Sequence, residues 1–158
     1  MVAELKGAIA GEMRTICRAD VVREVRSWIG TPYHHQASCK GAGADCLGLV
    51  RGVMRTLYGC EPETAPAYSP DWGEANAQET LLAAASRNLV RRDIVAVRAG
   101  DVLVFRMRRG AIAKHAAIMT GENLMVHAVE RVGVAEAPIG LWWRRRIAGA
   151  FSFHGIDD

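Results

Sequence analysis

A cysteine placed where a glycine-rich loop becomes an apolar helix constrains the fold of this chain more than any other feature. The loop, residues 41–44, has the sequence Gly-Ala-Gly-Ala, which does not favour regular structure. Asp45 is a favoured N-cap residue, so we expect a helix that begins near Cys46 and ends by Tyr58 and Gly59. Apolar residues recur after the cysteine at roughly helical spacing: Leu47, Leu49, Val50, Val53, Met54 and Leu57.

The start of a helix favours the reactive form of a cysteine. Unpaired N–H groups and the helix dipole stabilise a thiolate relative to a thiol, so the sequence predicts that Cys46 is ionised and nucleophilic. An isolated cysteine in an apolar run is more often a small buried hydrophobic residue. The nucleophile hypothesis therefore requires a histidine that the fold brings close to Cys46 as its base.

Two histidines lie in segments that we expect to be neighbouring strands. His115 lies in residues 112–119 and His127 in residues 124–129, and both segments are short apolar runs typical of buried strands. Gly-Glu-Asn at 121–123 favours a tight turn, so the strands would pair in antiparallel fashion. The two imidazoles could then lie side by side on one face, one as a general base and the other as its orienting partner.

The order of several motifs resembles that of the NlpC-type cysteine peptidases, which are papain-like hydrolases of bacterial cell walls. The motifs are Trp-Ile-Gly-Thr-Pro-Tyr at 28–33, Asp-Cys-Leu-Gly-Leu-Val at 45–50, Gly-Asp-Val-Leu-Val-Phe at 100–105, His115 with its apolar run, and His127 followed by Ala128. The resemblance extends from about residue 20 to residue 153. It looks closest to the phage-tail branch, which includes the gene transfer agents, through residues 33–38, 68–72 and 142–151.

The resemblance implies a fold of the α+β class, a single papain-like domain in which N-terminal helices pack on a small antiparallel sheet. It implies that Cys46 is the nucleophile and His115 the general base, and that His127 is the third polar residue, which holds the ring of His115. It also implies that Tyr33 and Asp45 line the substrate-binding cleft. In relatives that cut near the start of the stem peptide, the matching aspartate helps to receive the free amine of L-alanine.

The chain departs from the family pattern at two places. Leu47 stands after the nucleophile, where serine is common, and so removes a hydroxyl group from the cleft. His34, His35 and Gln36 replace the Gly-Gly that often follows the tyrosine segment. Both departures bear on the choice of substrate, and neither removes a member of the triad.

The resemblance implies hydrolysis of amide bonds in peptidoglycan stem peptides, of the D-glutamyl–diaminopimelate type. It also implies an enzyme carried in a phage-like tail, where it contacts tail hub and tip proteins and helps to penetrate the cell wall. Residues 1–12 lack a charged start followed by an apolar block, so we expect synthesis in the cytoplasm without a signal peptide and action in the wall or periplasm of a target cell. Two other classes stay open: a non-catalytic structural or plug component of the tail tip, and an acyl-transferring relative of the same fold.

Composition limits the other partners. A net charge of +3 is too small to argue for a nucleic-acid partner, and no apolar run approaches the roughly 20 residues of a membrane span. A chain of 158 residues, half of them hydrophobic, suits one domain. We expect an N-terminal arm over residues 1–18 and a peptidase domain over residues 19–158.

The cysteines indicate neither a metal site nor disulfides. Their spacing is not of the zinc-binding kind, and the sequence has no secretion signal, so we expect no metal, no cofactor and no disulfide. A metal site made by Cys39 and Cys46 with His34 or His35 is the alternative, and its irregular spacing disfavours it.

The remaining patterns predict the other elements. We expect a helix of about ten residues that Asp20 caps and Gly30 stops, an irregular loop over residues 60–73 that borders the cleft, and a third helix over residues 74–88. Short β-branched runs from about residue 94 onward predict the sheet.

Two basic clusters are left. Residues 106–109 are expected in a hairpin turn. Trp142 and Trp143, which precede three arginines at 144–146, would point to opposite faces of a strand, so that one packs inward and the other is exposed. An exposed tryptophan beside arginines is typical of a docking surface, here for tail proteins, and acidic wall polymer is the other candidate partner.

Overall fold

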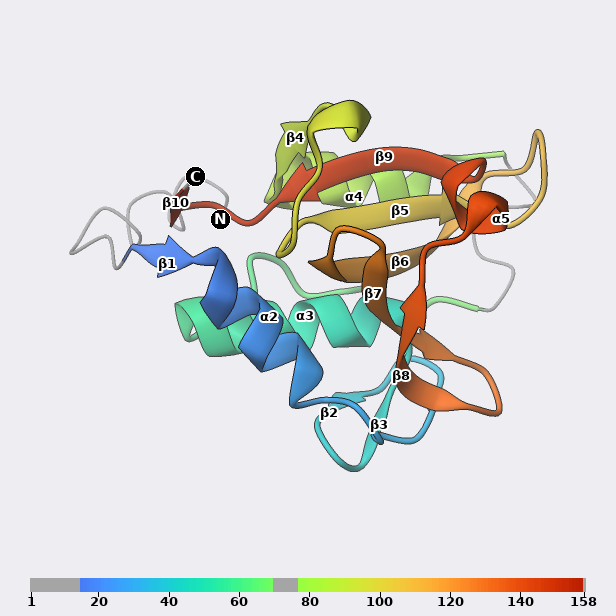
Figure 1. The fold of residues 1–158 in the computed structure, drawn as a ribbon. Coiled ribbons are helices and arrows are strands. Elements are labelled where there is room, and N and C mark those ends of the chain that lie inside the picture. Colours follow the sequence, from blue (N-terminus) through green and yellow to red (C-terminus); the bar gives the residue numbers. More distant parts are fainter. Residues whose placement is uncertain (1–14, 70–76, 158) are drawn as a thin grey trace.

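The computed structural model describes residues 15–69 and 77–157, which form the expected α+β domain with helices packed on an antiparallel sheet (Figure 1). The sheet has six strands in the order β4–β9–β5–β6–β7–β8. The strand bounds are Val90–Arg92 (β4), Val102–Arg106 (β5), Ala113–Gly121 (β6), Leu124–Val129 (β7), Gly133–Pro138 (β8) and Ile147–Ser152 (β9). Short strands form two further pairs: β1 (Ile16–Cys17) with β10 (Ile156–Asp157), and β2 (Ser38–Cys39) with β3 (Gly43–Ala44).

Each face of the sheet has its own apolar layer. Helices α2 (Arg18–Arg26), α3 (Cys46–Tyr58) and α4 (Thr80–Asn88) contribute to the larger core, together with the β6 residues Ala116 and Ile118. The smaller core lies on the other face, where Trp143 of the short helix α5 (Leu141–Arg144) packs against it. Alternate residues of β6 therefore point into different cores, as the two-residue period of a strand requires.

Helix α3 begins and ends where the sequence pattern predicts. Asp45 is its N-cap, and the Asp45 carboxylate accepts a hydrogen bond from the Gly48 N–H at 2.7 Å. Gly59 follows the last turn with φ of 77°, a left-handed conformation that glycine adopts without a steric penalty. Cys46 is thus the first residue of the helix, and its backbone N–H has no carbonyl one turn earlier to bind.

The β6–β7 pairing is short, and this opens a gap in the sheet. The paired residues run from Gly121 and Leu124 to Ile118 and Val126. Beyond that point β6 continues along β5, with Phe105 opposite His115, while β7 continues along β8. The edge of β6 around His115 therefore faces away from its sheet partner, toward the start of α3.

Two helices differ from the sequence expectation. Helix α2 begins at Arg18 rather than after Asp20, because Cys17 is the N-cap and Asp20 is the third helical residue, whose carboxylate accepts the Cys17 N–H at 3.3 Å. The helix ends at Arg26, before the turn that contains Gly30. The third helix begins at Thr80 instead of residue 74, and residues 74–76 lie outside the described part.

The expectation that Trp142 and Trp143 lie on a strand is wrong. They lie in α5, a single helical turn that follows Gly140. Trp142 is 48% exposed, and Trp143 packs inward against Phe105. The predicted difference in exposure between the two side chains is therefore confirmed, but it arises from a helical turn and not from the alternation of a strand. The expected hairpin turn at 106–109 is confirmed, between β5 and β6.

The expected N-terminal arm falls mostly on residues 1–14, which lie outside the described residues. Ile16 and Cys17 form β1, whose partner is β10 near the other end of the chain. In the part of the chain that the structure describes, no helix has both the length and the apolar character that a membrane crossing needs.

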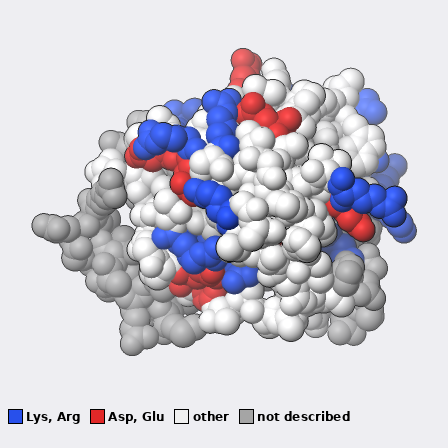
Figure 2. Space-filling model, turned by 90° about the horizontal axis from the view of Figure 1, so that it is seen from below, with Lys and Arg blue, Asp and Glu red and all other residues white. Residues whose placement is uncertain are grey.

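The surface carries interleaved charges on the face drawn in Figure 2, where basic and acidic side chains lie next to one another. Ion pairs of this kind include Lys40 with Glu24 and Arg26 with Glu136, both at 2.8 Å. Such exposed pairs contribute little to stability, about 0–1 kcal/mol each.

Close packing between α2 and α3 gives a test of the fold. A Cβ added at Gly52 would lie 2.1 Å from the Trp28 ring, which is 2% exposed, so we expect Gly52→Ala to lower the free energy of unfolding by about 1–3 kcal/mol. Gly140→Ala is the matched control, because Gly140 has φ of −74° and a Cβ there would meet no atom within 4 Å. Urea unfolding followed by circular dichroism measures both, and equal midpoints would contradict the packing argument.

Candidate active site

The sulfur of Cys46 lies against the open edge of β6. Its Sγ is 3.7 Å from the carbonyl oxygen of Lys114, to which the thiol donates, and the N–H of Ala116 points at the same sulfur. These two backbone groups flank His115 in the chain. The N-terminus of α3 and the strand that carries the expected base are therefore in direct contact at the nucleophile.

The structure brings the two expected histidines together. His115 Nε2 lies 3.0 Å from His127 Nδ1, and both residues are buried, with 9% and 5% of their surface exposed. With His115 Nε2 engaged by His127, the other ring nitrogen, Nδ1, is the one left to exchange a proton with the thiol. A general base needs that nitrogen unprotonated, which requires the tautomer in which His115 Nε2 donates to His127.

Trp143 covers this histidine pair, and sequence reasoning missed it. Its ring stacks on His115 at 5.3 Å between centroids with an interplanar angle of 30°, and it meets His127 edge-on at 5.3 Å. Phe105 contacts both Trp143 and His115 from the strand beside β6. The aromatic cover keeps water from the hydrogen bond between the imidazoles and fixes the ring of His115.

Asp45 is the centre of a hydrogen-bond network. In addition to capping α3, its carboxylate accepts the Gln36 N–H at 2.7 Å and the Tyr68 hydroxyl at 2.5 Å. His35 Nδ1 lies 3.7 Å from the same oxygen. Both carboxylate oxygens thus have partners within the protein, and they fix the start of α3. The expected contact between Asp45 and a substrate amine stays a prediction.

Tyr68 is a second residue that sequence reasoning did not assign. Its hydroxyl binds Asp45, and its carbonyl oxygen accepts hydrogen bonds from His35, at 2.8 Å, and from Gln36. The segment that replaces the usual Gly-Gly therefore ties the loop after α3 to the N-cap of the nucleophile helix. Only the position of Tyr68 in the loop expected to border the cleft hinted at this role.

Tyr33 lies in the same neighbourhood. It is half-buried and pairs with Ala44, the residue before Asp45. Burial first, and then the negative charges of the Cys46 thiolate and Asp45, raise the pKa of Tyr33 to about 12. The hydroxyl therefore keeps its proton at neutral pH and can donate a hydrogen bond to a substrate oxygen.

Desolvation favours the protonated form of the Cys46 sulfur. Burial raises the pKa of the Cys46 thiol to about 11, and the carboxylate of Asp45 acts in the same direction. Backbone N–H groups at the helix start and at Ala116 lower this pKa only in part. Burial of the charge thus opposes the resting thiolate that the sequence predicts, and the ionisation state of Cys46 stays a prediction.

The same effect keeps His115 neutral. Burial lowers the pKa of His115 to about 3, and positive charge on His127 acts in the same direction. Burial also lowers the pKa of His127. Burial thus favours the neutral forms of both the Cys46 thiol and the His115 imidazole.

The other cysteines lie away from this arrangement. Cys17, Cys39 and Cys60 are exposed and free. Within residues 15–69 and 77–157, no group of three or more His, Cys, Asp or Glu side chains is placed to hold a metal ion.

Comparison with known proteins identifies a family and a relative of known name. A family model described as the NlpC/P60 family matches residues 30–150, which include Cys46, His115 and His127. The murein DD-endopeptidase MepS/murein LD-carboxypeptidase of Escherichia coli K12 is 25% identical to the chain over 130 residues, which are 82% of this chain. The match covers 59% of that relative, so this chain spans about three fifths of its length.

Solved structures share the fold. A crystal structure of an NlpC/P60 family protein from Bacillus cereus superposes with a TM-score of 0.65 at 22% identity, covering 90% of this chain and 42% of that one. The NlpC/p60 domain of the peptidoglycan hydrolase SagA superposes with a TM-score of 0.60 at 22% identity, covering 87% of this chain and all of that domain. At this identity the similarity establishes the architecture alone.

The pKa directions give a test of the resting state. Alkylation by iodoacetamide needs the thiolate, and below a pKa of about 11 its fraction rises roughly tenfold per pH unit. We therefore expect the alkylation rate of Cys46 to climb from pH 6 to pH 10 without a plateau. Mass spectrometry of the peptide that contains Cys46 separates it from the exposed cysteines. A plateau that begins at mildly acidic pH would show a preformed thiolate and contradict this expectation.

Proposed function

Because the chain belongs to the NlpC/P60 family, we propose that it is a cysteine peptidase that hydrolyses amide bonds in the stem peptides of peptidoglycan. One observation carries the proposal: the thiol at the N-terminus of α3 touches β6 on both sides of His115, and His127 holds that imidazole under Trp143. A structural protein has no need for a thiol, a base and an orienting group in this arrangement.

The geometry supports acyl transfer through the sulfur. Cys46 Sγ attacks the amide carbonyl while His115 takes its proton, and the backbone N–H of Cys46 at the helix start donates to the developing oxyanion. His115 then gives the proton to the leaving amine, and the carbonyl stays on the sulfur as a thioester. Water, deprotonated by His115, attacks the thioester; the C–S bond breaks, the acid leaves, and the imidazolium returns its proton to the Cys46 sulfur. The neutral ring of His127 accepts a hydrogen bond from the imidazolium that forms in both halves of the reaction.

For the bond that is cut, the proposal is the D-glutamyl–diaminopimelate type, on the resemblance of the sequence motifs. The name of the Escherichia coli relative refers to DD-endopeptidase and LD-carboxypeptidase activities instead. Leu47 in place of serine and the network around Asp45 distinguish this cleft from the usual pattern. Digestion of intact sacculi and mass spectrometry of the released muropeptides assign the bond directly.

For its place of action, the proposal is a phage-like tail. The enzyme would be made in the cytoplasm, incorporated beside hub and tip proteins, and would act in the wall or periplasm of a target cell. The support is the resemblance of residues 33–38, 68–72 and 142–151 to the phage-tail branch, and residues 70–72 lie outside the described residues. Purified tail particles should contain the protein, and its presence only in the periplasm of the producing cell would contradict the proposal.

The nucleophile is tested by Cys46→Ala. We expect hydrolysis of purified peptidoglycan to fall at least about a thousandfold, because no other group can form the acyl-enzyme. Cys39→Ala, at an exposed cysteine, is the matched control and should cut at the wild-type rate. Wild-type activity in Cys46→Ala would exclude the proposed mechanism, whereas an inactive wild-type protein would favour the structural component of a tail. Acylation of an added amine without hydrolysis would favour the acyl-transferring class.

The orienting role is tested by His127→Ala. The variant keeps thiol and base but frees the ring of His115, so we expect kcat to fall about 10- to 100-fold, less than in His115→Ala. Muropeptide release at saturating substrate measures the difference. An equal loss in both variants would show that His127 does more than orient its neighbour.

A further inference from the structure

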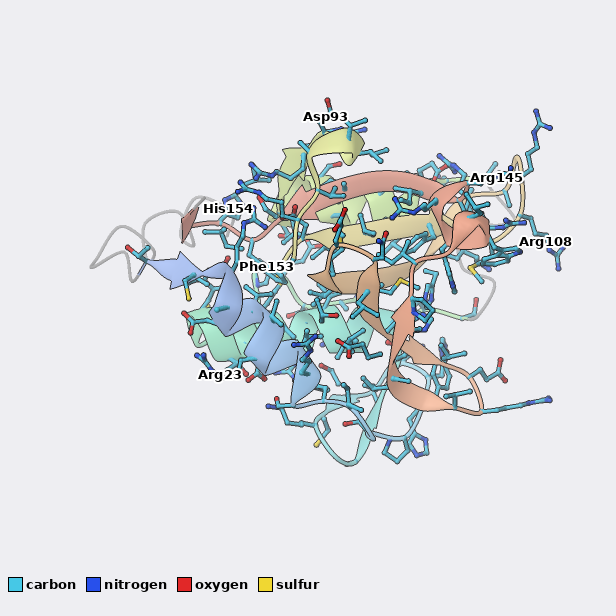
Figure 3. The ribbon with its side chains drawn as sticks, in the orientation of Figure 1. Arg23, Asp93, Arg108, Arg145, Phe153 and His154 are labelled. Atoms are coloured by element: carbon cyan, nitrogen blue, oxygen red, sulfur yellow. The ribbon has the colours of Figure 1, made fainter. Side chains whose placement is uncertain are left out.

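A hollow lined by arginines lies next to the candidate site. It has a volume of about 480 Å³ and is formed by the β5–β6 turn and the end of α5. Its basic side chains are Arg106, Arg108, Arg109, Arg145 and Arg146. Figure 3 shows Arg108 and Arg145 at the same end of the molecule, the end opposite to Arg23.

Three of these arginines are available to a ligand. Arg106 is occupied by Glu79 and by the Ala111 carbonyl oxygen, and Arg146 by the carbonyl oxygens of Trp142 and Met107. For the part of the chain that the structure describes, no acidic side chain forms an ion pair with the remaining three, Arg108, Arg109 and Arg145. Among the described residues, the charged side chains that line the hollow are all basic, so the hollow attracts anions.

A chain of ring contacts joins the hollow to His115. His115 lies 5.3 Å from Trp143, and Trp143 lies 4.8 Å from Trp142. The guanidinium of Arg146 lies 3.8 Å from the centre of the Trp142 ring. Each group in this chain of contacts limits the movement of the next. The hollow thus begins where the cover of the imidazole ends.

The position of His115 indicates which part of a substrate reaches the hollow. His115 gives its proton to the leaving amine, so the amine-side fragment lies beside His115 and its cover. In a stem peptide this fragment is short and ends in a free carboxylate. A guanidinium binds a carboxylate through two parallel N–H donors, and carboxylate recognition of this kind is strong.

We propose that the arginine hollow binds the C-terminal carboxylate of the amine-side fragment of the substrate. The inference rests on the proposed peptidase function and deepens it, because it makes the enzyme select stem peptides whose free end lies close to the cut bond. Stem peptides whose C-terminal carboxylate is cross-linked or amidated are poorer substrates. The cluster after Trp142 then serves the substrate rather than a tail protein.

Two peptides test the proposal by kinetics. One is L-Ala-γ-D-Glu-meso-diaminopimelate-D-Ala with a free C-terminal carboxylate, and the other is its C-terminal amide. We expect wild-type kcat/KM to favour the acid by about tenfold, mainly through KM, as one charge-assisted bidentate contact allows. The double variant Arg108→Gln, Arg145→Gln should cut both peptides equally and at the wild-type rate for the amide. Arg23→Gln, which removes one positive charge from a side chain that is 73% exposed, should keep the wild-type preference.

The outcomes separate the two proposals. Three results would each overturn the carboxylate site and leave the peptidase function standing. They are equal cleavage of acid and amide by the wild-type enzyme, a preference for the acid that survives in the double variant, and an equal loss of activity on both peptides in that variant. A wild-type enzyme that cuts neither peptide nor peptidoglycan would overturn the function.

Binding gives a readout without catalysis. Calorimetric titration of Cys46→Ala protein with the two peptides should show tighter binding of the acid by about tenfold, and this difference should vanish when Arg108→Gln and Arg145→Gln are added. Raising the salt concentration should weaken the binding of the peptide acid more than the binding of the amide. Equal affinities for acid and amide in Cys46→Ala would overturn the carboxylate site whatever the kinetics show.

Discussion

The contact between the N-terminus of α3 and the edge of β6 is the interaction on which the candidate site depends. The β6–β7 pairing ends at Ile118 and Val126, so backbone groups around His115 turn toward the helix instead of toward a strand. Buried N–H and C=O groups need partners, and the sulfur of Cys46 is one of them. Cys46 and His115, the candidate nucleophile and base, are therefore placed relative to each other by two hydrogen-bonded backbones. The Asp45 network adds a second constraint on the same helix start.

The aromatic residues around this contact affect how readily its groups ionise. Trp143 and Phe105 surround the imidazole pair, and in a dry environment neither the thiol nor the histidines ionise readily. The positive charges lie instead outside the aromatic cover, on arginines that stay hydrated and therefore lose little solvation free energy. The imidazole pair thus lies in an apolar enclosure that has an arginine-rich border. Both follow from the position of α5, which supplies the inner tryptophan and the arginines that follow it.

Local features of the fold were predictable where one residue decides a boundary. Asp45 and Gly59 define α3 because capping and a left-handed turn act within a few residues. The pairing of His115 with His127 followed from strand parity, since both lie on the same face of neighbouring strands. Helix α2 begins earlier than expected, because Cys17 caps it through an exchange of hydrogen bonds with Asp20 that ordinary cap preferences do not anticipate.

The amino-acid sequence by itself determined the family, the nucleophile helix and the histidine pair, because these depend on spacing and on short-range backbone chemistry. The tertiary structure alone decided the roles of Trp143 and Tyr68, which come from a single helical turn and an irregular loop and reach the site through contacts distant in sequence. It also decided the environment of the Cys46 sulfur. A sequence shows that a helix N-terminus favours a thiolate, but only the packed structure shows that burial acts on the pKa of the sulfur in the opposite direction.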